Sequence, residues 1–277
     1  MLNAANIKSL LTAKRLGSKL ELFDMIEHST NDHVAGLLSQ GEGVVTAALL
    51  QQGGRGRVGR AWKSGKIGES LALSFSICPQ LPITDYPMIT LAAALAVYDA
   101  IGVDFPCIKW PNDILFDGKK ACGILTELRS FEGKNYAVVG IGINIFQQSF
   151  PLEIAKKATS LAIAGAVADS DINREGYIEG LIARILNAFE GYMEIIERDG
   201  DFSELVDIYK SRLLGLDERV KILDFSEAGE DASKARLVIE GSVTGINNSG
   251  ALTLIDDEGV KHTIIGGELS LRGGFYE

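Results

Sequence analysis

Hydrophobic positions along the chain repeat with two different periods, and each period predicts one kind of element. Apolar residues at helical spacing predict helices over 6–16, 32–40, 86–101, 159–168, 173–198 and 202–213. Short apolar or alternating runs predict strands over 20–26, 44–50, 71–77 and 136–145, with a hairpin over 108–127. Asp117-Gly118 gives that hairpin its turn. The first part of the chain is therefore predicted to mix helices and strands.

The pattern changes after Gly215, where helical spacing stops. Short strands are predicted over 220–223, 235–246, 252–256 and 260–265, with turn residues at 247–250 and 257–259. A small all-β barrel of roughly sixty residues fits this spacing. We therefore predict three parts: a short helical lead-in over 1–16, an α+β domain over 17–214 and a small β domain over 215–277.

Composition and charge narrow the possible functions. Hydrophobic residues make up 46% of 277 residues, enough for a substantial core, and the net charge is −10. Such an acidic chain is not a general nucleic-acid binder, because phosphate backbones are bound by basic surfaces. No apolar run reaches the length of a membrane span. The three cysteines form no CxxC pair, which is typical of a reducing cytoplasm, and we expect a cytoplasmic protein.

The first twenty residues contain four basic and no acidic side chains. This composition has a faint likeness to a transit peptide. A short amphipathic lead-in helix is the simpler interpretation of the same residues.

A glycine-arginine loop over 53–60 is the densest chemical signal in the chain. Its glycines would let the backbone approach a ligand closely, and its three arginines, Arg55, Arg57 and Arg60, would repel one another without an anion between them. We expect such a loop to be mobile when empty and ordered by a ligand. It is not a Walker A loop, because no Gly-Lys-Ser/Thr follows. The structural alternative is a flexible, solvated surface loop.

Three further motifs could each contribute to a ligand-binding site. Residues 109–113 (KWPND) form a rigid proline corner with an amide and a carboxylate, 118–125 (GKKACGIL) place two lysines after a tight turn, and 139–144 (VGIGIN) alternate two glycines within a strand. The glycines leave one face of that strand bare, as a flat ligand would require. A structural turn, an ordinary hairpin end and a β-bulge are the respective alternatives.

These motifs occur in a specific order. Ser29-Thr30-Asn31, GRGRVGRAW over 54–62, KWPND, GKKACGIL and GIGIN together closely resemble the successive motifs of biotin protein ligases. Every fixed position of the family pattern GRGRxGRxW is met. The resemblance runs from about Leu16 to Leu271. It implies an α+β fold with a mixed-sheet, class II synthetase-like catalytic domain and a small C-terminal SH3-like β-barrel.

The resemblance also implies an activity. Such an enzyme activates biotin with ATP as biotinyl-5′-AMP, and Mg²⁺ accompanies the nucleotide. It then transfers biotin to a lysine of a biotin carboxyl carrier domain, releasing AMP and pyrophosphate. Homodimers are common in the family, so a homodimer is possible. Many bacterial members carry an N-terminal DNA-binding domain, whereas about sixteen residues precede the catalytic domain here. We therefore expect a monofunctional enzyme with no DNA partner and no membrane partner.

Site residues follow from the matched motifs. The resemblance assigns biotin binding to Ser29, Thr30, Asn31, Gln51, Gly54, Arg55, Gly56, Arg57, Lys120 and Gly123. It assigns ATP or adenylate binding to Arg57, Arg60, Trp62, Asn112, Lys120 and Asn144. It assigns catalysis to Lys120, Arg57 and Asp113, with Asp113 near the incoming carrier lysine. Two anions meet when a carboxylate attacks a phosphate, so cations at Arg57 and Lys120 fit this chemistry.

Three alternatives remain: another enzyme of the same fold superfamily, a regulator and an inactive binding module. A lipoate ligase or octanoyl transferase would share the fold, but those families lack the GRGRxGRxW loop. A biotin-sensing regulator would need a partner such as DNA, which the acidic charge disfavours. An inactive binding module would not need Arg57, Lys120 and Asn144 together.

Overall fold

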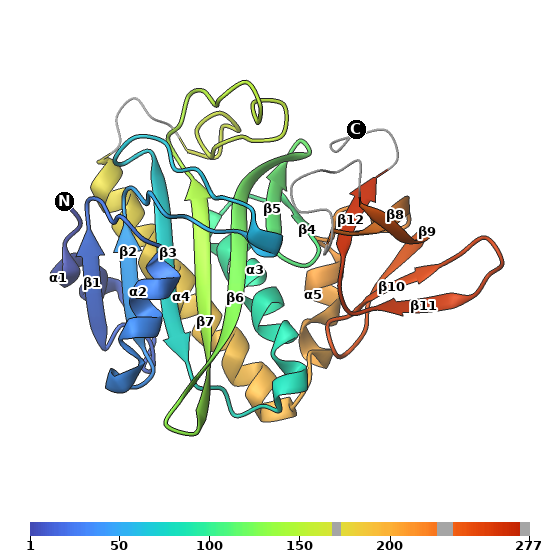
Figure 1. Ribbon diagram of the computed structural model, residues 1–277, viewed down its shortest axis with the longest axis horizontal. Coiled ribbons are helices and arrows are strands. Elements are labelled where there is room, and N and C mark those ends of the chain that lie inside the picture. Colours follow the sequence, from blue (N-terminus) through green and yellow to red (C-terminus); the bar gives the residue numbers. More distant parts are fainter. Residues whose placement is uncertain (168–172, 226–234, 272–277) are drawn as a thin grey trace.

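A mixed seven-stranded sheet forms the centre of the structure, a computed structural model that describes residues 1–167, 173–225 and 235–271 (Figure 1). The strand order is β1-β2-β3-β7-β6-β5-β4, in which β1 and β2 are parallel and all other neighbours are antiparallel. The strands are β1 Lys19–Phe23, β2 Val44–Ala48, β3 Ser70–Ile77, β4 Cys107–Lys109, β5 Asp113–Phe116, β6 Lys119–Phe131 and β7 Lys134–Asn144.

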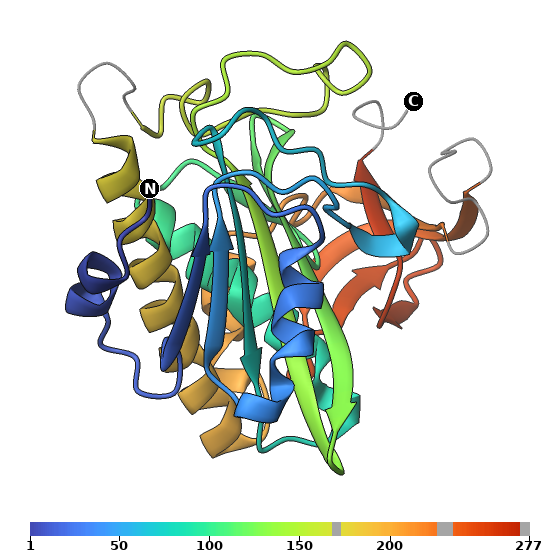
Figure 2. The same ribbon diagram turned by 60° about the vertical axis from the view of Figure 1, so that its left-hand side comes forward.

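Helices cover the two faces of this sheet unequally (Figure 2). Two long helices, α3 Pro87–Ile101 and α4 Arg174–Asp199, pack on one face, where Phe75 of β3 meets Phe189 with ring centroids 4.8 Å apart. Helix α3 is apolar nearly all round and is buried between the sheet and α4. Within the described residues, the α-helix on the other face is the short α2 Thr30–Gly36. The sheet is therefore left partly open on the α2 side.

The N-terminal segment, including helix α1 Ala4–Leu10, is fastened to α4 by buried carboxylates. Glu190 accepts hydrogen bonds from the backbone N–H groups of residues 14, 15 and 16, and Glu179 accepts one from Asn3. Both glutamates are less than a tenth exposed. These bonds satisfy charges that would be costly to bury alone.

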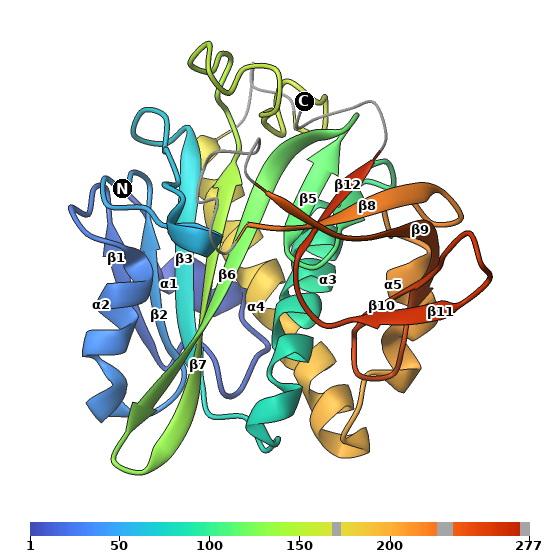
Figure 3. The same ribbon diagram turned by 45° about the vertical axis from the view of Figure 1, so that its right-hand side comes forward.

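A five-stranded antiparallel sheet lies beside α3 and α5 Val206–Lys210 (Figure 3). Its order is β11-β10-β9-β8-β12. The strands are β8 Arg219–Asp224, β9 Arg236–Ile246, β10 Leu252–Ile255, β11 Lys261–Ile264 and β12 Glu268–Leu271. Trp110 Nε1 donates to the Gly250 carbonyl at 3.0 Å, and the apolar side chains of this sheet join the main hydrophobic core. The two sheets therefore share one core.

Three predicted elements differ from the structure. The predicted helix over 159–168 is wrong: residues 159–167 form turns, and Ala168 lies outside the described residues. Thr159 and Leu161 donate backbone hydrogen bonds to Lys120 and Asn144, so this segment pairs with the ends of the two central strands β6 and β7. The helices predicted over 6–16 and 202–213 are present but shorter, as α1 and α5. In addition, strand β12 was not predicted. Among the described residues, no helix has both the length and the apolar character needed to cross a membrane.

Candidate functional site

A small open cavity of about 50 Å³ lies on the α2 side of the seven-stranded sheet. Glycines of β6 and β7 form its floor, and the 53–62 loop covers it. The lining residues are Ser29, Thr30, Asn31, Gln51, Arg55, Gly56, Arg57, Trp62, Ala72, Asn112, Lys120, Gly123, Ile124, Leu125, Gly140, Ile141 and Gly142.

One end of the cavity is polar but uncharged. Ser29 is the N-cap of α2, and its hydroxyl accepts from the Asn31 backbone N–H. The Thr30 backbone N–H and hydroxyl both donate to Gln51 Oε1, at 2.6 and 3.0 Å. This pairing fixes the Gln51 amide with its NH₂ group toward the loop, beside Gly54. The arrangement offers neutral donors and acceptors to a small polar group.

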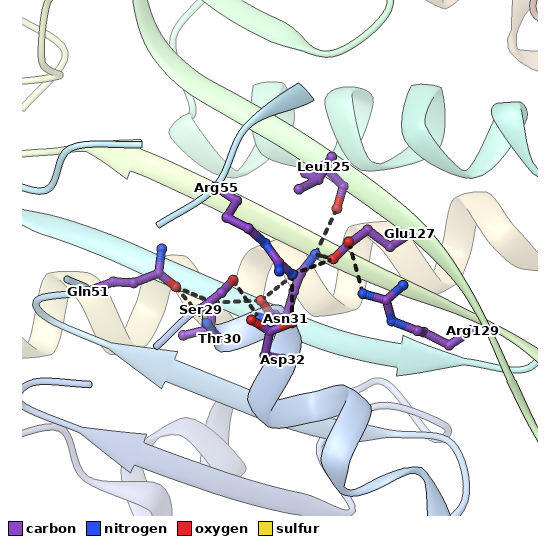
Figure 4. Close-up of polar contacts among 10 residues, drawn as sticks. Ser29, Thr30, Asn31, Asp32, Gln51, Arg55, Leu125, Glu127 and Arg129 are labelled. Atoms are coloured by element: carbon purple, nitrogen blue, oxygen red, sulfur yellow. Dashed lines mark hydrogen bonds and ion pairs between the residues drawn. The ribbon is translucent and has the colours of Figure 1, made fainter. Parts of the chain in front are cut away.

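Asn31 connects this end to the sheet (Figure 4). Its Nδ2 donates to Glu127 Oε2 at 2.7 Å and to the Leu125 carbonyl at 3.3 Å, both on β6. A side chain at residue 140 would overlap the Asn31 amide, so Gly140 permits this close approach.

A flat glycine surface lies at the centre of the floor. Gly123 and Gly142 are paired across β6 and β7, and the Trp62 indole rests on both. The indole Nε1 is buried and has no hydrogen-bond partner among the described residues. The two alternating glycines of β7 therefore leave one face bare, as predicted, and protein side chains occupy part of it here.

The other end of the cavity is cationic. Lys120 Nζ lies 2.7 Å from Asp113 Oδ1 and 5.8 Å from the Trp62 ring centroid. Arg57 Nη1 donates to Asn112 Oδ1 at 3.1 Å, and Asn112 in turn donates to the Ile124 carbonyl. Both cations are thus held in position by side chains of the KWPND corner.

Burial raises the pKa of two groups in this region, Cys122 and Tyr209, and keeps both neutral. The pKa of the Cys122 thiol is raised well above its usual range because the side chain is fully buried. The pKa of the Tyr209 hydroxyl is raised by burial and, to a lesser degree, by the Asp113 carboxylate. Neither group supplies a nucleophile at neutral pH.

The glycine-arginine loop forms a short hairpin with a 3₁₀ turn at Arg57–Gly59. Gly56 N–H donates to the Arg60 carbonyl at 2.6 Å, and Trp62 N–H to the Gly54 carbonyl at 3.0 Å. The three arginines separate: Arg55 reaches carboxylates of α2 and β6, Arg57 reaches an amide, and Arg60 lies 4.5 Å from the Phe225 ring centroid. Protein partners therefore relieve the repulsion that we expected a ligand anion to relieve.

The structure brings most of the predicted site residues together. The lining includes Ser29, Thr30, Asn31, Gln51, Arg55, Gly56, Arg57, Trp62, Asn112, Lys120 and Gly123. Gly54 packs against Trp62 and Gln51 at the loop base, and Asp113 lies behind Lys120, only 8% exposed.

Arg60 and Asn144 lie outside the cavity lining. Asn144 is buried, with Nδ2 donating to the Thr159 carbonyl at 3.0 Å and Oδ1 accepting from Gln147 at 3.1 Å. Their predicted contacts with the nucleotide stay predictions.

Sequence reasoning missed other lining residues and one neighbouring carboxylate. Ala72, Ile124, Leu125 and Ile141 line the cavity without having been assigned to it, whereas the alternating glycines of the floor were recognised as a bare face. Glu127 was also missed, although it contacts Asn31 and Arg55. Glu127 follows Ile124-Leu125-Thr126 as the first acid after Gly123, which was the available signal.

Comparisons with known proteins identify the family. Residues 23–144 match the model of the Biotin/lipoate A/B protein ligase family, and 234–272 match the Biotin protein ligase C terminal domain. The chain is 32% identical over 268 residues to the Bifunctional ligase/repressor BirA of Bacillus spizizenii, covering 94% of this chain and 76% of that protein. It is 34% identical over 188 residues to the Biotin--[acetyl-CoA-carboxylase] ligase of Mycobacterium tuberculosis, covering 65% of each chain.

A solved structure gives the same result for the fold. The chain superposes on the biotin protein ligase from Aquifex aeolicus in complex with biotin and ATP with a TM-score of 0.69 and 27% identity. The match covers 92% of this chain and 99% of that one.

Proposed function

This chain belongs to the biotin protein ligase family, and on that premise we propose how its cavity carries out ATP-dependent biotinylation. The enzyme converts biotin and ATP into biotinyl-5′-AMP and pyrophosphate, then transfers biotin to a lysine of a carrier protein and releases AMP. The observation that carries the assignment of the site is the cavity itself. A neutral polar end, a flat glycine floor and a cationic end occur in that order within one pocket.

Biotin fits the neutral end. Its ureido group needs a few donors and acceptors, which Ser29, Thr30 and Gln51 supply, and its ring system needs apolar contact, which the floor supplies. The valeryl carboxylate then points toward Arg57 and Lys120. Asn31 shapes this end through its bonds to β6.

Adenylate formation takes place at the cationic end. A carboxylate oxygen of biotin forms a bond to the α-phosphorus of ATP while the bond from that phosphorus to the pyrophosphate oxygen breaks. Arg57 and Lys120 reduce the repulsion between the two anions and stabilise charge that develops on the phosphoryl oxygens. Asp113 and Asn112 hold these cations before the substrates arrive, which reduces the reorganisation needed during the reaction.

Adenine is assigned to the surface beside Trp62, where an aromatic ring already rests on glycine backbone. Asn112 lies within this region. For Arg60 to reach the phosphate, its guanidinium must leave the Phe225 ring, and for Asn144 to bind the base, its amide must exchange partners. Both contacts therefore belong to a rearranged, ligand-bound state.

Transfer requires a carrier lysine at the same cationic end. Its neutral amine forms a bond to the acyl carbon of the mixed anhydride while the bond from that carbon to the phosphate oxygen breaks. AMP leaves, and the amine proton passes to solvent. A second, larger cleft between the two sheets shares Arg57, Ile124 and Leu125 with the cavity. We assign the approach of the carrier to this cleft. Asp113 is buried against Lys120, so it acts here by positioning that cation.

Four finer assignments accompany this function. Among the described residues, no group of three or more His, Cys, Asp or Glu side chains could hold a metal ion. Mg²⁺ would therefore arrive on the nucleotide, coordinated by phosphate oxygens and water, and would neutralise the departing pyrophosphate. We also propose a cytoplasmic enzyme that can form a homodimer, as is common in its family, and that, with its charge of −10, does not bind DNA.

A single assay tests the function. The purified protein is incubated with ATP, radiolabelled biotin and a biotin carboxyl carrier domain, with labelled lipoate in a parallel reaction. Biotin should appear on the carrier in an ATP-dependent reaction that releases AMP and pyrophosphate. Transfer of lipoate in preference to biotin, or no transfer of either, would contradict the assignment.

A further inference from the structure

The turn between β9 and β10 of the small sheet meets the KWPND corner in the interior of the protein. Trp110 of that corner is buried, and its Nε1 donates to the Gly250 carbonyl at 3.0 Å. The turn has its own hydrogen bonds, since Asn247 Oδ1 accepts from two of its backbone N–H groups. The contact therefore joins an ordered turn to the proline corner.

Gly250 also packs closely against α3. Its φ is +76°, and a Cβ atom there would lie 2.8 Å from Leu91 Cδ2. A side chain at this position would push the turn away from α3 and from Trp110. Glycine therefore serves both the backbone conformation and the close approach of the small sheet to the larger domain.

The same corner holds both cations of the cavity. Asn112 Oδ1 accepts from Arg57, and Asp113 Oδ1 lies 2.7 Å from Lys120 Nζ. The corner is also paired with β6, because the Ile124 N–H donates to the Asn112 carbonyl at 2.9 Å and Asn112 Nδ2 donates to the Ile124 carbonyl at 3.1 Å. A shift of this five-residue segment would therefore move the partners of both cations.

We propose that the contact between Trp110 and Gly250 positions the cationic end of the cavity, so that the small sheet contributes to adenylate formation without lining that cavity. The Trp110–Gly250 joint consists of these two residues. Trp110 is a positioning residue that acts through the two cations, and the cations act on the substrates. The effect on the reaction rests on the proposed function, whereas the effect on the corner does not.

The joint also borders the larger cleft that we assign to the carrier. Trp110 and Pro111 line this cleft from the corner, and residues 249–251 line it from the turn. A carrier in the cleft would contact the joint while its lysine reaches the cationic end. The joint therefore links the place where the carrier docks to the position of the cations.

Two variants loosen the joint from opposite sides. Trp110→Phe removes the hydrogen-bond donor and keeps an aromatic ring, whereas Gly250→Ala adds the methyl group that meets Leu91. Gly259→Ala is the matched control in the same sheet. Gly259 has a similar φ of +80°, but a Cβ there meets nothing within 4 Å, so the variant adds the backbone strain without the clash.

Hydrogen exchange of the ligand-free protein, measured by mass spectrometry, tests the corner without any reaction. Peptides that contain Ile124 should exchange roughly two- to tenfold faster in Trp110→Phe and Gly250→Ala than in wild type, because one hydrogen bond contributes modestly. Gly259→Ala should match wild type in these peptides.

Single-turnover formation of biotinyl-5′-AMP tests the effect on the reaction. The rate should fall roughly two- to tenfold in both joint variants, while the Kd for biotin stays close to wild type because most of its contacts lie at the neutral end. The double variant should be no slower than the slower single variant, since both changes break one contact.

A normal adenylation rate in both joint variants, even with a lowered Tm, would make the joint a structural contact only and overturn the proposal. Unchanged exchange of the Ile124 peptides in both variants would also overturn it. Absence of biotinyl-5′-AMP in the wild type would overturn the proposed function, and the exchange result would still show whether the small sheet positions the corner.

Discussion

The Trp62 indole lies on the backbone of Gly142. A Cβ atom at residue 142 would come within 2.5 Å of Trp62 Cε2 and 2.8 Å of Nε1, closer than packed side chains tolerate. The neighbouring Gly123 meets the same ring, since a Cβ there would lie 3.2 Å from Cζ3. Two paired glycines therefore determine how deeply the indole sits above the sheet.

Gly142→Ala should displace Trp62 and weaken nucleotide binding. One added methyl group cannot fit beneath the ring without moving it, so the KM for ATP should rise on the order of tenfold. Tryptophan emission should also change, because the surroundings of Trp62 change. The second tryptophan, Trp110, is buried and should contribute a constant background. Gly191→Ala on α4, where a Cβ meets nothing within 4 Å, is the matched control. A normal KM for ATP in Gly142→Ala would show that Trp62 does not form part of the adenine-binding surface.

Lys120→Gln should slow adenylate formation severely. The lost cation faces two anions in the transition state, and such contacts are worth about 2–4 kcal/mol, on the order of a hundredfold in rate. Glutamine is preferable to alanine because it leaves a polar partner for the buried Asp113. Single-turnover formation of biotinyl-5′-AMP measures the effect.

Lys119→Gln provides the comparison, since Lys119 begins the same strand but is exposed. It should retain the wild-type rate. If Lys119→Gln were slow and Lys120→Gln nearly normal, the two lysines would have to exchange roles.

The bare floor of the cavity could be predicted from sequence because it depends on residues that are close together in the chain. Residues two apart on a strand share one face, so the alternating glycines of 139–144 are enough to indicate a bare surface. The partners of the loop arginines could not be predicted in this way. Arg55 meets Asp32 and Glu127, which are 23 and 72 residues away. Nothing near Arg55 in the sequence distinguishes these acids from the other carboxylates of the chain.

The missed elements have a related explanation. Helical spacing over 159–168 reflected four alanines together with Leu161, Ile163 and Val167. Thr159 and Leu161 instead obtain backbone partners at the ends of β6 and β7, so tertiary pairing overrides local preference. Strand β12 was missed because Glu268–Leu271 is short and mixed in polarity. It is a strand because β8 offers it an antiparallel partner.

The three cysteines should differ in reactivity toward a thiol reagent. Burial raises the pKa of Cys107 to about 11 and raises that of Cys122 further, so little thiolate exists at either residue at pH 8. Partly exposed Cys78 should therefore react first. The Cys107 rate should climb about tenfold per pH unit up to its pKa, because thiolate is the reactive form. Three equally fast thiols in the native protein would contradict this packing.

Arg57→Gly should shorten the retention of biotinyl-5′-AMP more than it weakens the binding of biotin. Arg57 is held by Asn112 at the cationic end and borders both the cavity and the larger cleft, so it faces the phosphate of the adenylate at its exit. A hydrogen bond to a charged group contributes about 1.5–3 kcal/mol, so release should accelerate roughly ten- to a hundredfold. Free biotin carries only a carboxylate and retains its contacts at the neutral end.

The consequence is measurable without a carrier domain. Premature release delivers a reactive acyl phosphate to solution, where it should biotinylate lysines of a bystander protein such as serum albumin. Arg198→Gln, which removes an exposed cation near the end of α4, should leave bystander labelling at the wild-type level. If Arg57→Gly held its adenylate as long as wild type, Arg57 could not be the residue that retains biotinyl-5′-AMP in the cavity. Retention would then have to come from Lys120 and the other residues of the glycine-arginine loop.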